Sequence, residues 1–191
     1  MATITIREPR ATWPDEFLVI ARAIRAALGA TALRIDHIGS TAVAGLAAKD
    51  IIDIQVTVED LNDPAITIGL ESMGATNTGI TNDHLPPGMD LERSELDKLL
   101  FALRPPLRPA NIHVRQDGRF NQGYALLCRD YLRSHPDAVA AYAEIKQQLA
   151  RRFADDPGSY YDIKDPVFDL LMAGARVWAV ATSWEQGPSG T

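Results

Sequence analysis

The chain has 191 residues, of which 46% are hydrophobic and 23% are charged, enough apolar material for a core without a disulfide or metal staple. Its formal net charge is −6, whereas nucleic-acid-binding proteins usually carry a basic surplus, so we expect no nucleic-acid partner. No apolar run approaches the roughly 20 residues that span a bilayer, and the N-terminus lacks a signal-peptide pattern. We therefore expect a cytoplasmic protein without a membrane partner.

The length favours one domain over residues 1–184, followed by a disordered polar tail over residues 185–191. Residues 3–6 alternate with β-branched side chains and predict a short strand or an extended arm. Residues 12–29 predict a helix that ends at Gly29, and residues 33–38 predict a short strand. Residues 51–58 are apolar at both parities, which predicts a strand inside the sheet. A second helix is expected over residues 60–74.

Residues 76–95 are rich in Thr, Asn, Pro, Gly and Asp, and predict a long loop with a short strand near Ile80. Two strands are expected at residues 98–106 and 111–116. Three helices follow, at residues 121–135, 136–154 and 165–184, and the single cysteine, Cys128, is predicted to be buried. A mixed sheet flanked by helices and followed by C-terminal helices is an α+β fold.

The turn Gly39-Ser40-Thr41 lies between the two apolar runs of the first half. Glycine frees backbone N–H groups at such a turn, and the two hydroxyls add donors, so the turn could bind a phosphate. An ordinary strand-to-helix turn is the simpler interpretation. Asp53 strengthens the phosphate hypothesis, because a carboxylate among isoleucines needs a partner, such as Mg²⁺ or the cation of Lys49. A plain salt bridge from Asp53 is the alternative.

Two histidines lie in or next to apolar strands. Asn111, His113 and Arg115 alternate with apolar residues and share one face of their strand. If the strands are neighbours, His37, His113, Asp53 and Arg115 could converge for acid–base work or metal binding. Both histidines could instead be hydrogen-bonded to backbone at strand ends.

The first C-terminal helix carries Gln122, Arg129 and Arg133 on one face. These arginines could reach a phosphate, although a solvated helix edge is the commoner arrangement. Lys146 and Lys164 are further cationic candidates. No pair of His or Cys residues has a metal-binding spacing.

Residues 37–54 resemble the GrpB family, in which the pattern His-Ile-Gly-Ser-Thr is followed by Gly-Leu-Ala-Ala-Lys and Ile-Ile-Asp-Ile. The Trp-Pro-x-x-Phe of residues 13–17, the strand at 111–115 and the C-terminal helices also resemble the family, so the resemblance runs from about Trp13 to Trp178. It implies a nucleotidyltransferase-like fold. A similar domain is fused to dephospho-CoA kinases in some bacteria, which implies a bacterial origin for this chain.

The resemblance also implies roles for single residues. Gly39 and Ser40 match a signature that cradles a nucleotide phosphate, and Asp53 matches the first acid of a metal-binding Asp-x-Asp pair. Gln55 stands where that pair has its second acid, as is common in the family. Three further positions depart from the family pattern, namely Ala44, Asp50 and Asn111, the last replacing the first His of a His-x-His strand.

Three functions are weighed. The first is a nucleotidyltransferase-type enzyme that binds a nucleotide or phosphorylated small molecule, uses Mg²⁺ on Asp53, and activates a hydroxyl through the metal or His113. The second keeps the pocket but performs acid–base chemistry without nucleotidyl transfer. The third is a non-catalytic binding or assisting module. In the first, His37 joins Asp53 and His113 as a catalytic candidate, and the candidate phosphate ligands are Gly39, Ser40, Thr41, Lys49, Arg115 and Arg129. The oligomeric state is left open.

Overall fold

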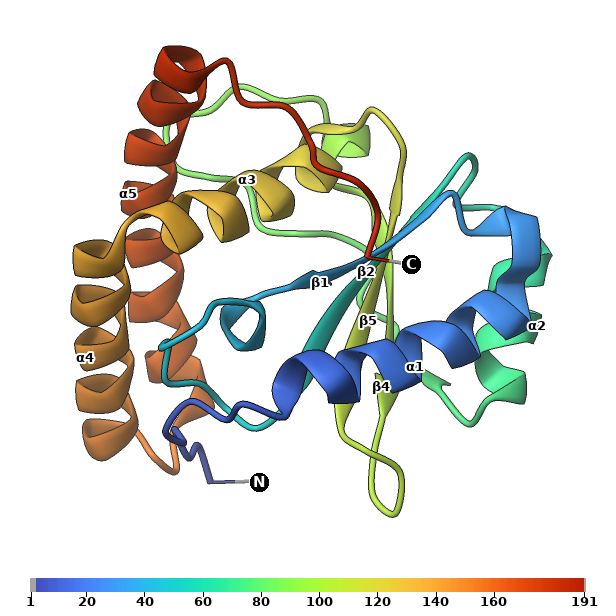
Figure 1. The fold of residues 1–191 in the computed structure, drawn as a ribbon, viewed down its shortest axis with the longest axis horizontal. Helices are drawn as coiled ribbons and strands as arrows, with labels where there is room; N and C mark the ends of the chain where they lie inside the picture. Colours follow the sequence, from blue (N-terminus) through green and yellow to red (C-terminus); the bar gives the residue numbers. More distant parts are fainter. Residues whose placement is uncertain (1–2, 191) are drawn as a thin grey trace.

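The structure, a computed structural model, describes residues 3–190. Its centre is a sheet of five strands (Figure 1). Three of the four neighbouring pairs are antiparallel, and the pair β2–β5 is parallel, so the sheet is mixed as predicted. In spatial order the strands are β1 (Arg34–Ile38), β2 (Ile52–Val58), β5 (Ala110–Gln116), β4 (Lys98–Leu103) and β3 (Thr76–Asn77).

Helices cover the two faces of the sheet unequally (Figure 1). The first two helices pack on one face and close the largest apolar cluster, which includes Trp13, Phe17 and Ile54. The three C-terminal helices gather on the other side with a smaller cluster around Leu46 and Met172. The helices are α1 (Trp13–Leu28), α2 (Pro64–Ser72), α3 (Phe120–Ser134), α4 (Pro136–Arg152) and α5 (Pro157–Thr182).

Most predicted elements are confirmed, with two shifted helix starts. Helix α2 begins at Pro64, because the Asp63 side chain caps it by accepting from the Ala65 backbone N–H. Helix α5 begins at Pro157, well before residue 165, because Asp156 caps the backbone N–H of Ser159. Both helices therefore start at a capped proline, and α5 continues through Pro166.

Residues 3–6 form the extended arm, one of the two predicted alternatives, tied by a bridge between Arg7 and Ala48. One strand prediction needs correction. The strand expected near Ile80 lies instead at Thr76–Asn77, and the long loop joins the sheet again through a bridge between Asn82 and Asp97. Strand β2 pairs on both sides and Cys128 is buried, as predicted.

The C-terminal tail, predicted to be disordered, lies along the free edge of β1. The Gly190 backbone N–H donates to the Ile35 carbonyl at 3.0 Å, and the Arg34 guanidinium donates to the Gly187 carbonyl at 2.7 Å. Composition describes an isolated tail, whereas an edge strand offers unpaired backbone groups that a tail can satisfy. Disorder of the tail stays a prediction. Residue 191 lies outside the described residues, and the single domain over 1–184 stays a prediction.

Candidate functional site

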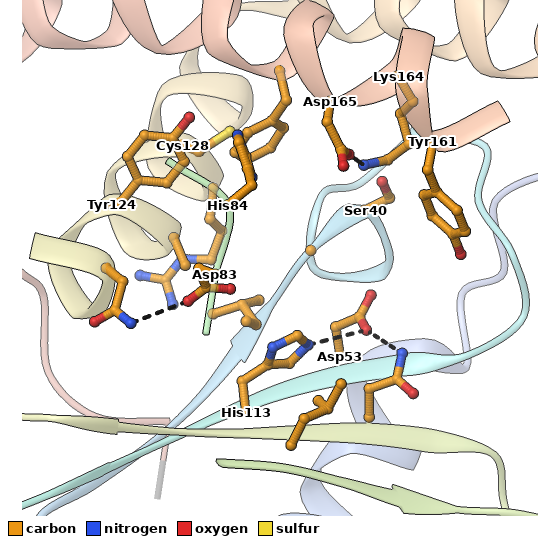
Figure 2. A pocket seen from close by; sticks show the side chains of 18 of the residues that line it. Ser40, Asp53, Asp83, His84, His113, Tyr124, Cys128, Tyr161, Lys164 and Asp165 are labelled. Atoms are coloured by element: carbon orange, nitrogen blue, oxygen red, sulfur yellow. Dashed lines mark hydrogen bonds and ion pairs between the residues drawn. The ribbon is translucent and has the colours of Figure 1, made fainter. Parts of the chain in front are cut away.

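A cavity of about 500 Å³ separates the sheet from the C-terminal helices (Figure 2). Its floor is the face of β2, β4 and β5 that carries Asp53, Lys98 and His113. The turn at Gly39 forms one side, the loop around Asp83 forms another, and α3, α4 and α5 form the roof. On the α1 side, apolar side chains fill the space between helices and sheet, whereas on this side the space is left as a cavity.

The predicted turn and acid meet at the edge of this cavity. The β1–β2 register pairs Ile38 with Asp53, so the turn that follows Ile38 begins beside the carboxylate. Gly39 has φ +67, and a Cβ on it would lie 2.6 Å from Asp53 Oδ2. Only glycine combines this backbone conformation with so close an approach.

Asp53 is held by two residues of β5. The Asn111 side-chain amide donates to Asp53 Oδ1 at 2.9 Å, and His113 Nε2 lies 3.8 Å from the same oxygen, an ion-pair distance rather than a hydrogen bond. Burial raises the pKa of the Asp53 carboxyl, but His113, Asn111 and the charge of Lys49 outweigh it, so the pKa falls below its ordinary value. Asp53 is therefore ionised at neutral pH.

His113 lies between an anion and a cation. One ring nitrogen faces Asp53, and the other lies 3.5 Å from the Arg115 guanidinium. Burial lowers the pKa of the imidazole, Asp53 opposes this, and Arg115 and Lys98 add to it, so the pKa lies below its ordinary value. His113 is thus a neutral imidazole at pH 7, as a proton acceptor must be.

Lys146, which the sequence singled out only weakly, is the buried cation of the site. Its ammonium group donates to Ser40 Oγ at 2.8 Å and to the Ala47 carbonyl at 2.5 Å, and lies 4.7 Å from the centre of the Tyr142 ring. The residue is 2% exposed and forms no ion pair with a carboxylate in residues 3–190. Burial lowers the pKa of Lys146 to about 7, and the nearby charge of Lys164 contributes.

Two further lysines stand on the same side of the cavity. The Lys49 ammonium donates to the Tyr161 hydroxyl and lies 4.8 Å from the centre of that ring. Lys164 donates to Asp165 at 2.9 Å (Figure 2). Tyr161 lies on a turn of α5 that precedes the predicted helix start at residue 165, so the sequence pattern gives no sign that it borders the cavity.

Asp83 from the long loop is bound by four donors. Arg115 donates to both of its oxygens, at 2.9 and 3.0 Å, Lys98 donates at 2.6 Å and Asn121 at 3.1 Å. Burial raises the pKa of Asp83, but Arg115 and Lys98 hold it well below the usual range. The composition of the loop does not distinguish Asp83 from its other polar residues. The Asp83 carboxylate neutralises Arg115, which was predicted to bind phosphate.

Gln55 occupies the position of the second acid without exposing a free donor or acceptor atom. Its side-chain oxygen accepts from Arg115 at 2.6 Å, and its side-chain nitrogen donates to the Gln122 carbonyl at 3.0 Å. Residues 3–190 contain no group of three His, Cys, Asp or Glu side chains placed to hold a metal ion. Within the described residues, Asp53 is the one carboxylate that β2 itself carries.

His37 lies on the other face of the sheet, so the predicted convergence of two imidazoles is wrong. It pairs with Ile54, stacks on Phe17 at 4.7 Å, and shares a hydrogen bond of 2.9 Å with the Thr41 hydroxyl. Successive side chains of a strand alternate between faces, which separates His37 from Ile38 and Asp53. Burial lowers the pKa of His37 to about 4, and neither His37 nor Thr41 lines the cavity.

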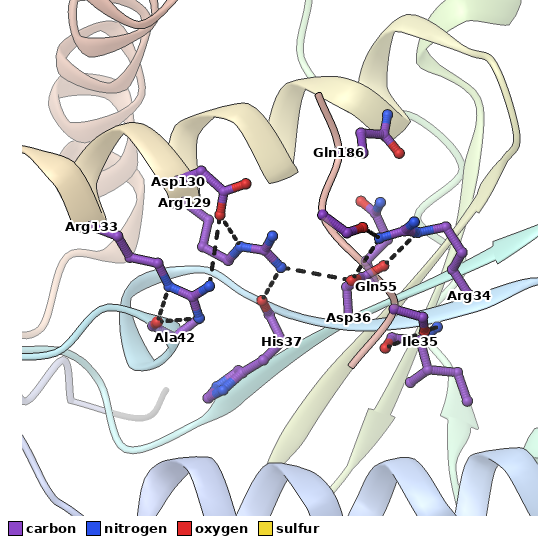
Figure 3. A network of polar contacts seen from close by, with 12 residues as sticks. Arg34, Ile35, Asp36, His37, Ala42, Gln55, Arg129, Asp130, Arg133 and Gln186 are labelled. Atoms are coloured by element: carbon purple, nitrogen blue, oxygen red, sulfur yellow. Dashed lines mark hydrogen bonds and ion pairs between the residues drawn. The ribbon is translucent and has the colours of Figure 1, made fainter. Parts of the chain in front are cut away.

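Two arginines of α3 contact β1 and the turn that follows it (Figure 3). Arg129 donates to Asp130 at 2.7 Å and to the His37 carbonyl at 3.2 Å, and lies 3.7 Å from Asp36. Arg133 donates to the Ala42 carbonyl at 3.0 and 2.9 Å. Arg129 borders the cavity, but its guanidinium already contacts Asp130, Asp36 and the His37 carbonyl.

The far end of the cavity is aromatic. Figure 2 shows Tyr124, His84 and Cys128 at the end away from Tyr161 and Lys164. The Tyr124 hydroxyl donates to Asp169 at 2.7 Å, and His84 lies 3.1 Å from the same carboxylate. The cavity thus has Ser40 and three of its lysines at one end and the Tyr124 ring at the other.

This sheet, with a Gly-Ser turn packed against a strand carboxylate, belongs to the nucleotidyltransferase-like folds. The structure matches a crystal structure of the Cid1 poly(U) polymerase with MgGTP bound at TM-score 0.50 and 14% identity, over 77% of this chain and 45% of that one. At this identity the match shows the fold alone. Within that fold the family is specific: the model described as "GrpB protein" matches residues 3–173, and the chain belongs to this family.

Solved and curated relatives agree with this assignment. The crystal structure of GrpB from Enterococcus faecalis matches at TM-score 0.75 and 28% identity, over 91% of this chain and 99% of that one. The UPF0157 protein PA4798 of Pseudomonas aeruginosa is 36% identical over 85% of this chain and 64% of its own length. The dephospho-CoA kinase of Mycolicibacterium paratuberculosis is 34% identical over 96% of this chain but 49% of its own length. The chain thus spans about half of that kinase.

Two departures from the family pattern have clear partners here. Asn111, in place of the usual His, gives Asp53 a neutral amide donor. Asp50 accepts from Arg10 at 2.7 Å, from Trp13 at 2.9 Å and from Arg108 at 2.5 Å, outside the cavity. Asp50 therefore ties the arm and α1 to the sheet. No helix in the described residues is long and apolar enough to cross a membrane.

Proposed function

We propose that the cavity binds a nucleotide or another phosphorylated small molecule, with a phosphate at the Gly39-Ser40 turn. The observation that carries the proposal is the buried ammonium of Lys146, hydrogen-bonded to the Ser40 hydroxyl without a carboxylate partner in the described chain. A buried cation without an anion is costly, and a phosphate would supply the missing charge.

The distribution of lysines supports this proposal. The sequence contains four lysines, and all four line this one cavity: Lys49, Lys98, Lys146 and Lys164. Lysines are usually scattered over exposed surfaces, and this chain is acidic overall. Concentrating them around a hollow produces a local positive potential that attracts anions.

The candidate phosphate ligands contribute unequally to the proposal. Gly39, Ser40 and Lys49 keep the role that the sequence suggested, and Lys146 joins them. Arg115 is held by Asp83 and Gln55, so it adds positive charge rather than a free donor. Arg129 is turned toward Asp130 and the His37 carbonyl.

The proposed reaction is nucleotidyltransferase-type: the hydroxyl oxygen of a small acceptor forms a bond to the α-phosphorus of a nucleoside triphosphate, the bond to pyrophosphate breaks, pyrophosphate leaves with the electron pair, and the hydroxyl proton passes to the Asp53–His113 pair. Asp53 is ionised and its Oδ2 borders the turn, so it can orient that hydroxyl by accepting its hydrogen bond. His113, neutral beside it, positions the carboxylate and is the proton acceptor that we propose. The aromatic end of the cavity would take the remainder of the ligand.

Magnesium on Asp53 stays a prediction. The donor set does not fit a pair of divalent ions, because Gln55 is neutral and its oxygen accepts from Arg115, and Asp83 is neutralised by Arg115 and Lys98. A single Mg²⁺ commonly binds one or two carboxylates plus phosphate oxygens, and Asp53 could be that one carboxylate. When bound, such an ion would stabilise negative charge developing on the transferred phosphate.

The lone carboxylate also favours a second candidate, a pocket that binds a phosphorylated ligand without nucleotidyl transfer. His113 and Asp53 would then perform acid–base chemistry, or the domain would assist a partner enzyme. The half-length match to dephospho-CoA kinases supports an assisting role. Dephospho-CoA therefore belongs in any ligand panel.

The test is thermal stability against nucleotides, dephospho-CoA and sugar phosphates, because a ligand of the native state raises the melting temperature. We expect a shift for the wild type that disappears in Lys146→Met. Arg151→Met is the matched control, since it removes an exposed positive charge from α4 outside the cavity. Failure of every phosphorylated ligand to shift the wild type would contradict the proposal.

A further inference from the structure

The four lysines of the cavity fall into two pairs. Lys98 and Lys164 each donate to a carboxylate, Asp83 at 2.6 Å and Asp165 at 2.9 Å. Lys49 and Lys146 form no ion pair in the part of the chain that the structure describes; their ammonium groups contact hydroxyls and a carbonyl. In the described residues, the two lysines beside the Ser40 turn therefore have no carboxylate within ion-pair distance.

A fixed cation also lies against the second-acid position. Gln55 follows Asp53 by two residues on the same face of β2, and its side-chain oxygen accepts from Arg115. An acid here would be neutralised by the guanidinium, and the amide that replaces it carries no charge. By the resemblance above, metal-dependent members of the fold have a metal-binding acid at the position of Gln55. Here this position carries an amide, and the Arg115 guanidinium of β5 lies against it.

The balance of charge around the cavity opposes a free divalent ion. Five cationic side chains face the cavity without counting Arg129, whose partners Asp36 and Asp130 lie outside it. Three carboxylates face it, and two of those, Asp83 and Asp165, are already paired. A divalent cation would meet more like charge than opposite charge, whereas an anion would meet the reverse.

We infer that the cavity binds a phosphate monoester dianion through Lys49, Lys146 and the Ser40 turn, without needing a divalent ion to bridge ligand and protein. The two charges of the dianion match the two lysines that lack a carboxylate. The inference rests on the proposed phosphate site and narrows its ligand to a phosphate monoester. A monoester has no pyrophosphate to leave, so this ligand fits the second candidate function, a pocket that works without nucleotidyl transfer.

Asp53 makes the inference testable by sign. Its carboxylate lies close enough to Lys49 and Lys146 to interact with both charges. If the lysines alone hold the phosphate, Asp53 repels the ligand, and neutralising it strengthens binding. If a metal ion bridges the ligand to Asp53, neutralising it abolishes binding.

The experiment is calorimetric titration with AMP, with ATP and with inorganic phosphate, each in EDTA and in Mg²⁺. We expect AMP to bind equally in both, to bind several-fold tighter to Asp53→Asn, and about tenfold weaker to Lys146→Met. Asp162→Asn, which neutralises an exposed acid on α5 outside the cavity, is the control and should leave affinity unchanged. Circular dichroism confirms folding of each variant.

The outcomes separate the inference from the proposed function. Binding that requires Mg²⁺ and is lost in Asp53→Asn overturns the inference and leaves the phosphate site in place. No binding of any phosphorylated probe in either buffer overturns both. Equal affinity for AMP and inorganic phosphate in EDTA supports the inference and identifies the free anion as sufficient for recognition.

Discussion

The two faces of strand β2 show how one short segment builds both a core and a site. On the α1 side, Ile52, Ile54, Val56 and Val58 are fully buried in the largest apolar cluster. On the other side, Asp53 and Gln55 carry polar groups toward the cavity and α3.

The two histidines divide in the same way. His37 on the α1 side is stacked on Phe17, and burial lowers its pKa to about 4. His113 on the cavity side lies between Asp53 and Arg115. Identical side chains therefore have different surroundings according to strand parity, and residue type alone does not show which histidine reaches the cavity.

The sharpest way to break this comparison is to truncate adjacent residues of β2. Ile54→Ala should lower the free energy of unfolding by about 2–5 kcal/mol, because it leaves a cavity in a fully buried cluster. Asp53→Ala, one residue away, should cost at most about 1 kcal/mol, because its side chain borders a hollow that already exists. Urea denaturation measures both. Equal losses would show that the cavity face is packed as tightly as the core.

Sequence reasoning found the face of β2 but not the far wall of the site. Period-two alternation and the Gly-Ser turn were enough to predict that Asp53 and the turn share a pocket, and the register confirms their contact. The same alternation, applied to β1 against β2, would have excluded His37, but the register of an antiparallel pair is set by tertiary structure.

The missing residues come from segments that carry no periodic signal or that depend on long-range packing. Asp83 lies in an irregular loop, and only the fold brings it to Arg115. Lys146 sits on a helix that could have faced solvent, and it is buried because α4 packs over the turn after β1. The one signal in the sequence is that it has only four lysines, and the fold brings all four to the cavity.

Gly39 sharpens the comparison of the two faces of β2, because it follows β1 and lies against Asp53 on the cavity face. Gly39→Ala should cost about 2 kcal/mol of stability, since its φ of +67 is unfavourable for alanine and the new Cβ meets Asp53. Gly45→Ala is the matched control: its φ is +78, but a Cβ there meets nothing within 4 Å. A larger loss at Gly39 than at Gly45, measured by thermal denaturation, isolates the contact with the carboxylate.

The smallest expected effect is on stability in Lys146→Met, which should raise the free energy of unfolding by about 1 kcal/mol while weakening the proposed phosphate binding about tenfold. The substitution replaces a buried ammonium that has no carboxylate partner with an apolar side chain of similar length. A site that costs stability in the free protein is a common mark of function.

The pH dependence gives the sign of this effect. The pKa of Lys146 is about 7 in the folded chain against 10.5 for the unfolded group, so between these values the unfolded chain binds more protons. Wild-type stability should therefore rise relative to Lys146→Met as pH increases from 7 toward 10.5, and the full penalty should remain below pH 7.

Anion binding should show the opposite trend and weaken above pH 7, because the neutral amine no longer attracts the ligand. Sulfate is the probe for that titration, since its charge is constant over the range, and an affinity that stays flat with pH would remove Lys146 from the site.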